Sequence, residues 1–186
     1  SHSKNEVGVY RRRYTVPDNF DGREIFIHFG AVKSAFFLYI NGQRVGYSQG
    51  SMTPAEFNIT KYLVPGENLV TVEVYRYSDG TYLEDQDMWW HGGIVRDVYL
   101  LALNENHISD IFASATLDDS YTNGILKVTG ALHLADHPSG IWKMKLKLYD
   151  GAGKLVKNSA SEIEFPENKV DPNHLVCCEN QGVAEI

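Results

Sequence analysis

Residues 78–93 hold the densest group of polar and aromatic side chains in the 186-residue sequence. Glu84, Asp85 and Asp87 are close neighbours in it, and two tryptophans follow them. Carboxylates accept hydrogen bonds from sugar hydroxyls or ligate hard cations, while tryptophans offer flat stacking surfaces. An EF-hand is excluded, because the required ligand spacing and closing Glu are absent. The segment is therefore a candidate carbohydrate or cation site.

The same segment also has a purely structural interpretation. Asp and Gly residues form turns, the acids could pair with Arg76 or Arg96, and Trp89 and Trp90 could plug the end of a sandwich. Composition alone favours this second interpretation. Both stay open at this point.

Other chemical signatures are missing from the sequence. Its seven histidines show no zinc-like pair spacing with cysteine, so we expect no structural metal site. The sequence has no G-x-S-x-G elbow, phosphate loop or dinucleotide fingerprint. Cys177 and Cys178 are adjacent, which makes a disulfide between them improbable. No nucleophile with an arranged base can be named.

Charge and hydropathy exclude two classes of partner. The formal net charge is −7 and the pI is about 5.4, so no surplus of cations is available to neutralise phosphates. The basic run Arg11 to Arg13 lies in a strand-like segment, whose alternation sends its members to opposite faces. No apolar run approaches the length of a membrane span. We therefore expect no nucleic-acid and no membrane partner.

Short alternating runs separated by Gly, Pro, Asn and Asp indicate an all-β protein. Residues 24–29 alternate, and residues 35–40 lead into Asn41-Gly42, a strong signal for a two-residue hairpin. Residues 69–76 and 95–103 predict further strands, and residues 59–63 a single turn. The pattern pauses at residues 104–106, which predicts a domain boundary there.

The second part shows a similar pattern. Residues 108–112, 125–132 and 142–149 predict strands, and a tight turn follows at 150–153. Two weaker strands are expected at 161–165 and 174–178, and the final residues have no evident partner. We predict domains at 1–104 and 105–186, the second an immunoglobulin-like sandwich. Whether this second sandwich is complete stays open.

Several motifs resemble glycoside hydrolase family 2. The stretches at 10–17, 29–35, 39–48 and 54–60 match its N-terminal sugar-binding jelly roll in order and spacing. The most specific stretch is Tyr-Leu-Glu-Asp-Gln-Asp-Met-Trp at 82–89, which resembles β-galactosidases more than other members. The resemblance implies a galactose-binding-domain-like jelly roll, followed by part of an immunoglobulin-like domain.

The resemblance also implies where catalysis occurs. Retaining family members use two glutamates on a TIM barrel that follows the immunoglobulin-like domain, and this sequence ends before such a barrel. Glu84, Asp85 and Asp87 match no catalytic position, so none is assigned a catalytic role. Asp87 matches an aspartate that binds galactose and helps to hold sodium together with barrel residues.

Two departures from relatives concern this site. Trp90-His91-Gly92 stands where many relatives carry an arginine after the first tryptophan. A second sugar-contacting residue, an asparagine, belongs to a family segment that precedes the equivalent of Tyr10 and is not in this sequence.

The expected function is that of a non-catalytic N-terminal fragment of a β-galactosidase. The parent enzyme would act on β-galactosides with sodium, and magnesium as a further candidate ion, whereas the fragment itself needs no cofactor. Its expected partner is the TIM barrel of the same chain, in a homo-oligomeric cytoplasmic enzyme whose natural N-terminus lies upstream. The alternative is a self-standing carbohydrate-binding module.

Overall fold

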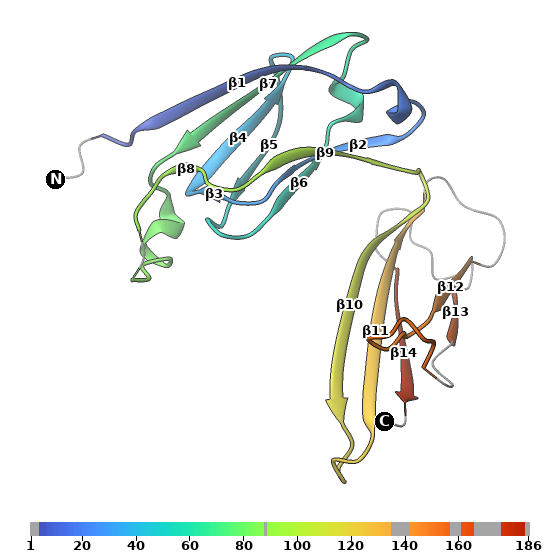
Figure 1. Ribbon diagram of the computed structural model, residues 1–186. Helices are drawn as coiled ribbons and strands as arrows, with labels where there is room; N and C mark the ends of the chain where they lie inside the picture. The colour runs from blue at the N-terminus through green and yellow to red at the C-terminus, as the bar shows by residue number, and fades with distance from the viewer. Residues whose placement is uncertain (1–3, 88, 135–141, 157–160, 166–175, 185–186) are drawn as a thin grey trace. The chain divides into compact units, whose positions relative to one another are not determined.

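The structure is a computed structural model that describes residues 4–87, 89–134, 142–156, 161–165 and 176–184. It is built from β-strands with three short 3-10 turns, as Figure 1 shows. The chain divides into two compact units, Ser1–Asn104 and Glu105–Ile186. The division falls where the strand pattern of the sequence pauses. The all-β prediction is confirmed.

Two antiparallel sheets form the first unit. The four-stranded sheet has the order β1 (Val7–Thr15), β7 (Glu67–Tyr75), β4 (Ala35–Ile40) and β5 (Gln43–Gln49). The three-stranded sheet has the order β6 (Ala55–Asn58), β2 (Glu24–Phe29) and β9 (Val98–Leu103). A short pair joins β3 (Val32–Lys33) to β8 (Gly93–Ile94). The turns are η1 (Asp18–Phe20), η2 (Thr60–Tyr62) and η3 (Asp79–Tyr82).

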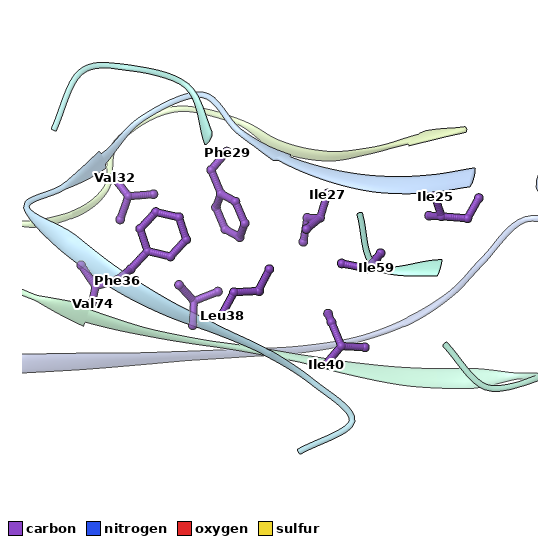
Figure 2. Packing of buried hydrophobic residues seen from close by; sticks show 10 residues of the cluster. Ile25, Ile27, Phe29, Val32, Phe36, Leu38, Ile40, Ile59 and Val74 are labelled. Atoms are coloured by element: carbon purple, nitrogen blue, oxygen red, sulfur yellow. The ribbon is translucent and has the colours of Figure 1, made fainter. Parts of the chain in front are cut away.

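The core lies between these two sheets, and strict alternation along the strands builds it. Every second residue of β2 points inward, so Ile25, Ile27 and Phe29 are buried while their neighbours are partly exposed. Figure 2 shows them facing Leu38 and Ile40 of β4. Burying each such side chain contributes about 1.5–3 kcal/mol. This packing holds the sandwich together.

The hairpin between β4 and β5 has the predicted two-residue turn. Asn41 and Gly42 both adopt positive φ, at 50° and 80°, and Ile40 pairs with Gln43. Paired positive φ values match the right-handed twist of the flanking strands. The predicted strand boundaries at 35 and 40 are those of β4.

The two sides of this sandwich differ. On one side the chain passes from β5 to β6, and a Cβ added to Gly46 would lie 2.5 Å from the Phe57 ring, so the sheets meet closely there. On the other side, a mostly apolar cavity of about 530 Å³ lies between the edge strands β1 and β9. Its floor includes Ile27, Phe29 and Val72.

The described residues of the second unit also form two sheets. One has the order β10 (His107–Leu117), β11 (Gly124–His133) and β14 (Val176–Ala184), and the other pairs β12 (Trp142–Leu146) with β13 (Ser161–Phe165). Met144 of β12 packs against Leu132 and Leu134, and its Cε would lie 2.4 Å from a Cβ on Gly130. These contacts make the unit a sandwich.

Two predicted strands differ from the observed ones. The strand expected over 142–149 ends at Leu146, which pairs with Ser161, the first residue of β13. An isolated bridge between Tyr149 and Leu155 then encloses the turn at 150–153. The strand expected over 174–178 begins outside the described residues, and its end at 178 is wrong, because β14 pairs with β11 as far as Ala184. Residues 179–184 therefore do have a partner, which lies 50 to 60 residues earlier and leaves no local sequence signal.

Candidate functional site

The candidate site is the connection from β7 to β8, residues 76–92, called here the acidic loop (green in Figure 1). It leaves an inner strand of the four-stranded sheet and returns at β8, which pairs with β3. Both ends of the loop are therefore fixed by sheet hydrogen bonds.

The first turn of the acidic loop is anchored to the core. Ser78 caps η3 in a capping box with Thr81, whose Oγ1 accepts from the Ser78 amide at 2.9 Å. The hydroxyl of Ser34 donates to Ser78 Oγ at 2.7 Å, and Ser34 is 1% exposed. The root of the loop thus rests on a buried hydroxyl.

The three carboxylates of the loop have different environments. Glu84 is half-buried, and its Oε1 accepts from the backbone amide of Ser51 at 3.0 Å while its Oε2 accepts from the Ser51 hydroxyl. Asp85 and Asp87 are exposed. Glu84 therefore connects the acidic loop to Ser51, whereas Asp87 is accessible to a ligand. The sequence could not separate these roles, because alternation does not apply within a loop.

The aromatic residues after Asp87 lie on the surface. Trp89 is 83% exposed, and its ring stacks on His91 with 5.7 Å between centroids and 5° between planes. Trp90 lies under the Nζ of Lys33, which is 4.7 Å from the ring centroid. The interpretation that these tryptophans plug the sandwich is wrong for Trp89, which is exposed. Its face is available for stacking.

Arg76, one of the two arginines expected as partners of the loop acids, has a different partner. Arg76 forms an ion pair with Glu6, with 2.5 Å between Nη1 and Oε2, and this hydrogen bond raises the pKa of Arg76 above its usual value. Both residues line a cavity of about 420 Å³ together with Trp90 and His91. Arg13, of the basic run, pairs with Glu67 at 2.8 Å.

A single carboxylate can bind a sugar, but the retaining mechanism of glycoside hydrolysis needs a second one. Retaining glycosidases need two carboxyl groups about 5–5.5 Å apart on either side of the scissile bond. Asp87 can accept two hydroxyl hydrogen bonds or supply one hard oxygen ligand to a cation. Within the part of the chain that the structure describes, no three His, Cys, Asp or Glu side chains converge as a metal site. In those same residues, no helix is long and apolar enough to cross a membrane.

Comparison with known proteins identifies the family. A family model described as "Glycosyl hydrolases family 2, sugar binding domain" matches residues 1–104. The chain belongs to this family. The match covers the whole first unit, including the acidic loop.

Curated Beta-galactosidases are also similar in sequence. A Beta-galactosidase of Priestia megaterium is 45% identical over 153 residues, which cover 82% of this chain. A Beta-galactosidase of Pseudoalteromonas haloplanktis is 42% identical over 168 residues, which cover 90%. The chain spans about 15% of the length of each of these two relatives.

Solved structures of family members share the fold. A β-glucuronidase of Bacteroides uniformis superimposes with a TM-score of 0.81 over 98% of this chain and 22% of its own, at 22% identity. A putative β-galactosidase of Bacteroides fragilis gives a TM-score of 0.82 over 98% of this chain and 28% of its own, at 21% identity. At these identities the likeness shows the fold of the jelly-roll and immunoglobulin-like sandwiches.

Sequence reasoning missed the residues that support the site. Ser34 and Ser51 lie 44 and 33 positions from their partners in the acidic loop, Ser78 and Glu84. Both serines are buried, at 1% and 3% exposure. A serine next to a turn is too common a feature to have revealed either contact.

Proposed function

We propose that this chain is the non-catalytic N-terminal part of a retaining β-galactosidase that hydrolyses terminal β-D-galactosides. The observation that carries the proposal is the 45% identity to a Beta-galactosidase over 153 residues, which include the acidic loop. The two glutamates of such an enzyme lie on a TIM barrel in another part of the polypeptide. This chain supplies scaffold and one binding carboxylate.

Asp87 is the carboxylate that we assign to the active site. It is exposed, and the loop that carries it is fixed at Ser78 and Glu84. An aspartate held in this way can accept hydrogen bonds from vicinal galactose hydroxyls. Asp87 also suits sodium as one hard oxygen ligand, and the remaining ligands come from the barrel. Bound sodium would add positive charge that orients the substrate hydroxyls.

The remaining features of the parent enzyme belong to the same proposal. The TIM barrel is the partner of the acidic loop, and the active enzyme is a cytoplasmic homo-oligomer. Magnesium is a further ion of the parent enzyme, with no ligand assigned in this chain. Neither nucleic acid nor a membrane is a partner, in keeping with the net charge of −7.

The test compares this chain with the full-length polypeptide that contains it, using a chromogenic galactoside. We expect turnover by the full-length protein and none by the purified chain alone. Asp87→Ala in the full-length protein should lower kcat/KM by about 30-fold or more, because a charged hydrogen-bond partner of the substrate is lost. The unfolding temperature should change little, since Asp87 is exposed. A full rate and an unchanged sodium response in this variant would contradict the role of Asp87.

The alternative function is a self-standing carbohydrate-binding module, and the exposed Trp89 favours it. A flat aromatic face beside a carboxylate is sufficient to bind a sugar weakly. Titration calorimetry of the chain with galactose and lactose separates the two functions. Millimolar or tighter binding that Trp89→Ala abolishes would support the module, whereas the main proposal expects no measurable binding by the isolated chain.

A further inference from the structure

Glu84 ties the acidic loop to a distant turn of the sandwich. Its carboxylate accepts two hydrogen bonds from Ser51, one from the backbone amide at 3.0 Å and one from the hydroxyl. Hydrogen bonds to an ionised carboxylate are shorter and about twice as strong as neutral ones. Ser51 lies in the connection from β5 to β6, which crosses from one sheet to the other. Glu84 therefore fixes the loop relative to both sheets.

The turn that holds Ser51 is itself rigid. Gly50 has a φ of 113°, which favours glycine, and a Cβ there would lie 2.7 Å from Thr53 Oγ1. The amide and hydroxyl of Thr53 both donate to the Gly50 carbonyl, at 3.2 and 2.9 Å. Ser51 is 3% exposed, so its hydroxyl has little freedom to turn to solvent. Ser51, the partner of Glu84, is thus held in one position.

The backbone before Glu84 is fixed as well. The Glu84 amide donates to the Gly80 carbonyl at 2.9 Å, and Gly80 belongs to η3, which Ser78 caps. Asp87 follows Glu84 by three residues, a chain length that can reach only about 10 Å. The position of Glu84 therefore limits the region that Asp87 can occupy.

We propose that Glu84 is a positioning residue, which holds Asp87 in place for substrate and sodium through its hydrogen bonds to Ser51. This inference rests on the proposed function of Asp87. It separates two carboxylates of one loop, since Asp87 binds the ligand and Glu84 only sets where Asp87 lies. A displacement of about 1 Å in a positioning group can cost about 100-fold in rate.

The kinetic test uses the full-length polypeptide with Glu84→Gln, which keeps the size of the side chain and removes its charge. We expect kcat/KM to fall by about 10-fold to 100-fold, and the sodium concentration for half-maximal activity to rise. Asp85→Asn is the matched control, because it removes an exposed carboxylate from the next position. It should stay within about twofold of the unaltered protein.

A double-mutant cycle identifies Ser51 as the partner. Ser51→Ala should reduce activity and weaken the sodium response in the same direction as Glu84→Gln. The combined variant should lose less than the product of the two single effects, because both act on one contact. Independent, multiplying effects would overturn the proposed link.

Amide hydrogen exchange on the 186-residue chain tests the positioning without any enzyme assay. We expect faster exchange at the amides of Ser51 and Glu84 in Glu84→Gln, because the first donates to Glu84 Oε1 and the second to the Gly80 carbonyl, with unchanged exchange in β4 and β7. Unchanged exchange at both of these amides would overturn the inference.

The two proposals fail in different ways. An active full-length protein that Asp87→Ala impairs and Glu84→Gln leaves unaltered retains the proposed function and overturns the positioning role. A full-length protein without galactosidase activity overturns the proposed function, and faster exchange in Glu84→Gln would still support a fixed loop.

Discussion

The side-chain amide of Asn41 donates to Oδ1 of Asn68 at 2.8 Å, which joins the β4–β5 turn to the start of β7. Asn68 is 1% exposed. Its Oδ1 also accepts from the Val64 amide at 2.9 Å, and its Nδ2 donates to the carbonyls of Val64 and Gly66 at 2.9 and 3.1 Å. One buried side chain therefore satisfies the polar groups of two separate turns.

Replacing Asn68 should destabilise the first unit strongly. Asn68→Ala removes four hydrogen bonds, although the Asn41 side-chain amide still donates to the Tyr62 carbonyl. We expect the free energy of unfolding to fall by about 2–4 kcal/mol, since each hydrogen bond contributes about 0.5–1.5 kcal/mol. Urea titration of the chain measures the change. Asn19→Ala, at an exposed position of η1, is the control and should stay within about 0.5 kcal/mol. Equal midpoints for the two variants would show that the buried network contributes nothing.

The Asn41 turn could be predicted from the sequence, whereas its link to Asn68 could not. An Asn-Gly pair between two apolar runs determines the hairpin locally, because both residues tolerate positive φ. The hydrogen bond to Asn68 joins residues 27 positions apart. Nothing in the residue types near Asn68 distinguishes it from an ordinary turn asparagine. The local geometry of the turn could therefore be predicted from the sequence, whereas the hydrogen bond to a distant residue could not.

Asp118 should make the second unit sensitive to acid. Its Oδ1 accepts from the Thr122 amide and the Ser120 hydroxyl, both at 2.9 Å, and its Oδ2 accepts from Asn123 Nδ2 at 2.8 Å. The Thr122 hydrogen bond is the main cause that lowers the pKa of Asp118 to about 2. The charged form is thus favoured in the folded state, and its stabilisation is present above the ordinary pKa of about 3.9. It is lost as the pH falls from there through 2.

The matched pair for this prediction is Asp118→Asn and Asp119→Asn. At pH 7 we expect a lower unfolding temperature for Asp118→Asn, because an amide in either orientation gives the Thr122, Ser120 and Asn123 donors a weaker partner. The exposed neighbour Asp119 should tolerate the same change. Thermal unfolding between pH 2 and 7 measures both variants. A deficit of Asp118→Asn that persists undiminished near pH 2 would contradict this role for the charge.

In the acidic loop, as at the Asn41 turn, local features could be predicted from the sequence and long-range contacts could not. Its residue types indicated a site for a sugar or a cation, because carboxylates and tryptophans are concentrated there. Which carboxylate turns inward depends on Ser51, which lies 33 positions before Glu84. A strand would have assigned the faces by alternation, but a loop has no such period. The position of the site could therefore be predicted from the sequence, whereas the separate roles of its carboxylates could not.

Tyr14 should make the first unit sensitive to alkali and should be replaceable with a gain in stability. It lines the apolar cavity between β1 and β9, and among the described residues its buried hydroxyl has no hydrogen-bond partner. Burial raises the pKa of Tyr14 to about 12. The folded state holds the Tyr14 proton more tightly than the unfolded chain. Titration of Tyr14 therefore does not lower the free energy of unfolding below the ordinary pKa of about 10. It lowers this free energy progressively as the pH rises from 10 through 12.

Tyr14→Phe removes the unpaired hydroxyl and the titration together. We expect the variant to be more stable by about 1 kcal/mol at pH 8, since a buried polar group without a partner costs free energy that a phenyl ring does not. Its advantage should widen between pH 10 and 12, as only the unaltered protein must then hold a neutral phenol. Tyr10→Phe removes the hydroxyl of a tyrosine in the same strand that is 42% exposed, and should stay within about 0.5 kcal/mol at pH 8. Urea unfolding at pH 8, 10 and 11.5 measures all three proteins. A less stable Tyr14→Phe at pH 8 would mean that the hydroxyl has a partner in solution, such as a bound water, that stabilises the fold.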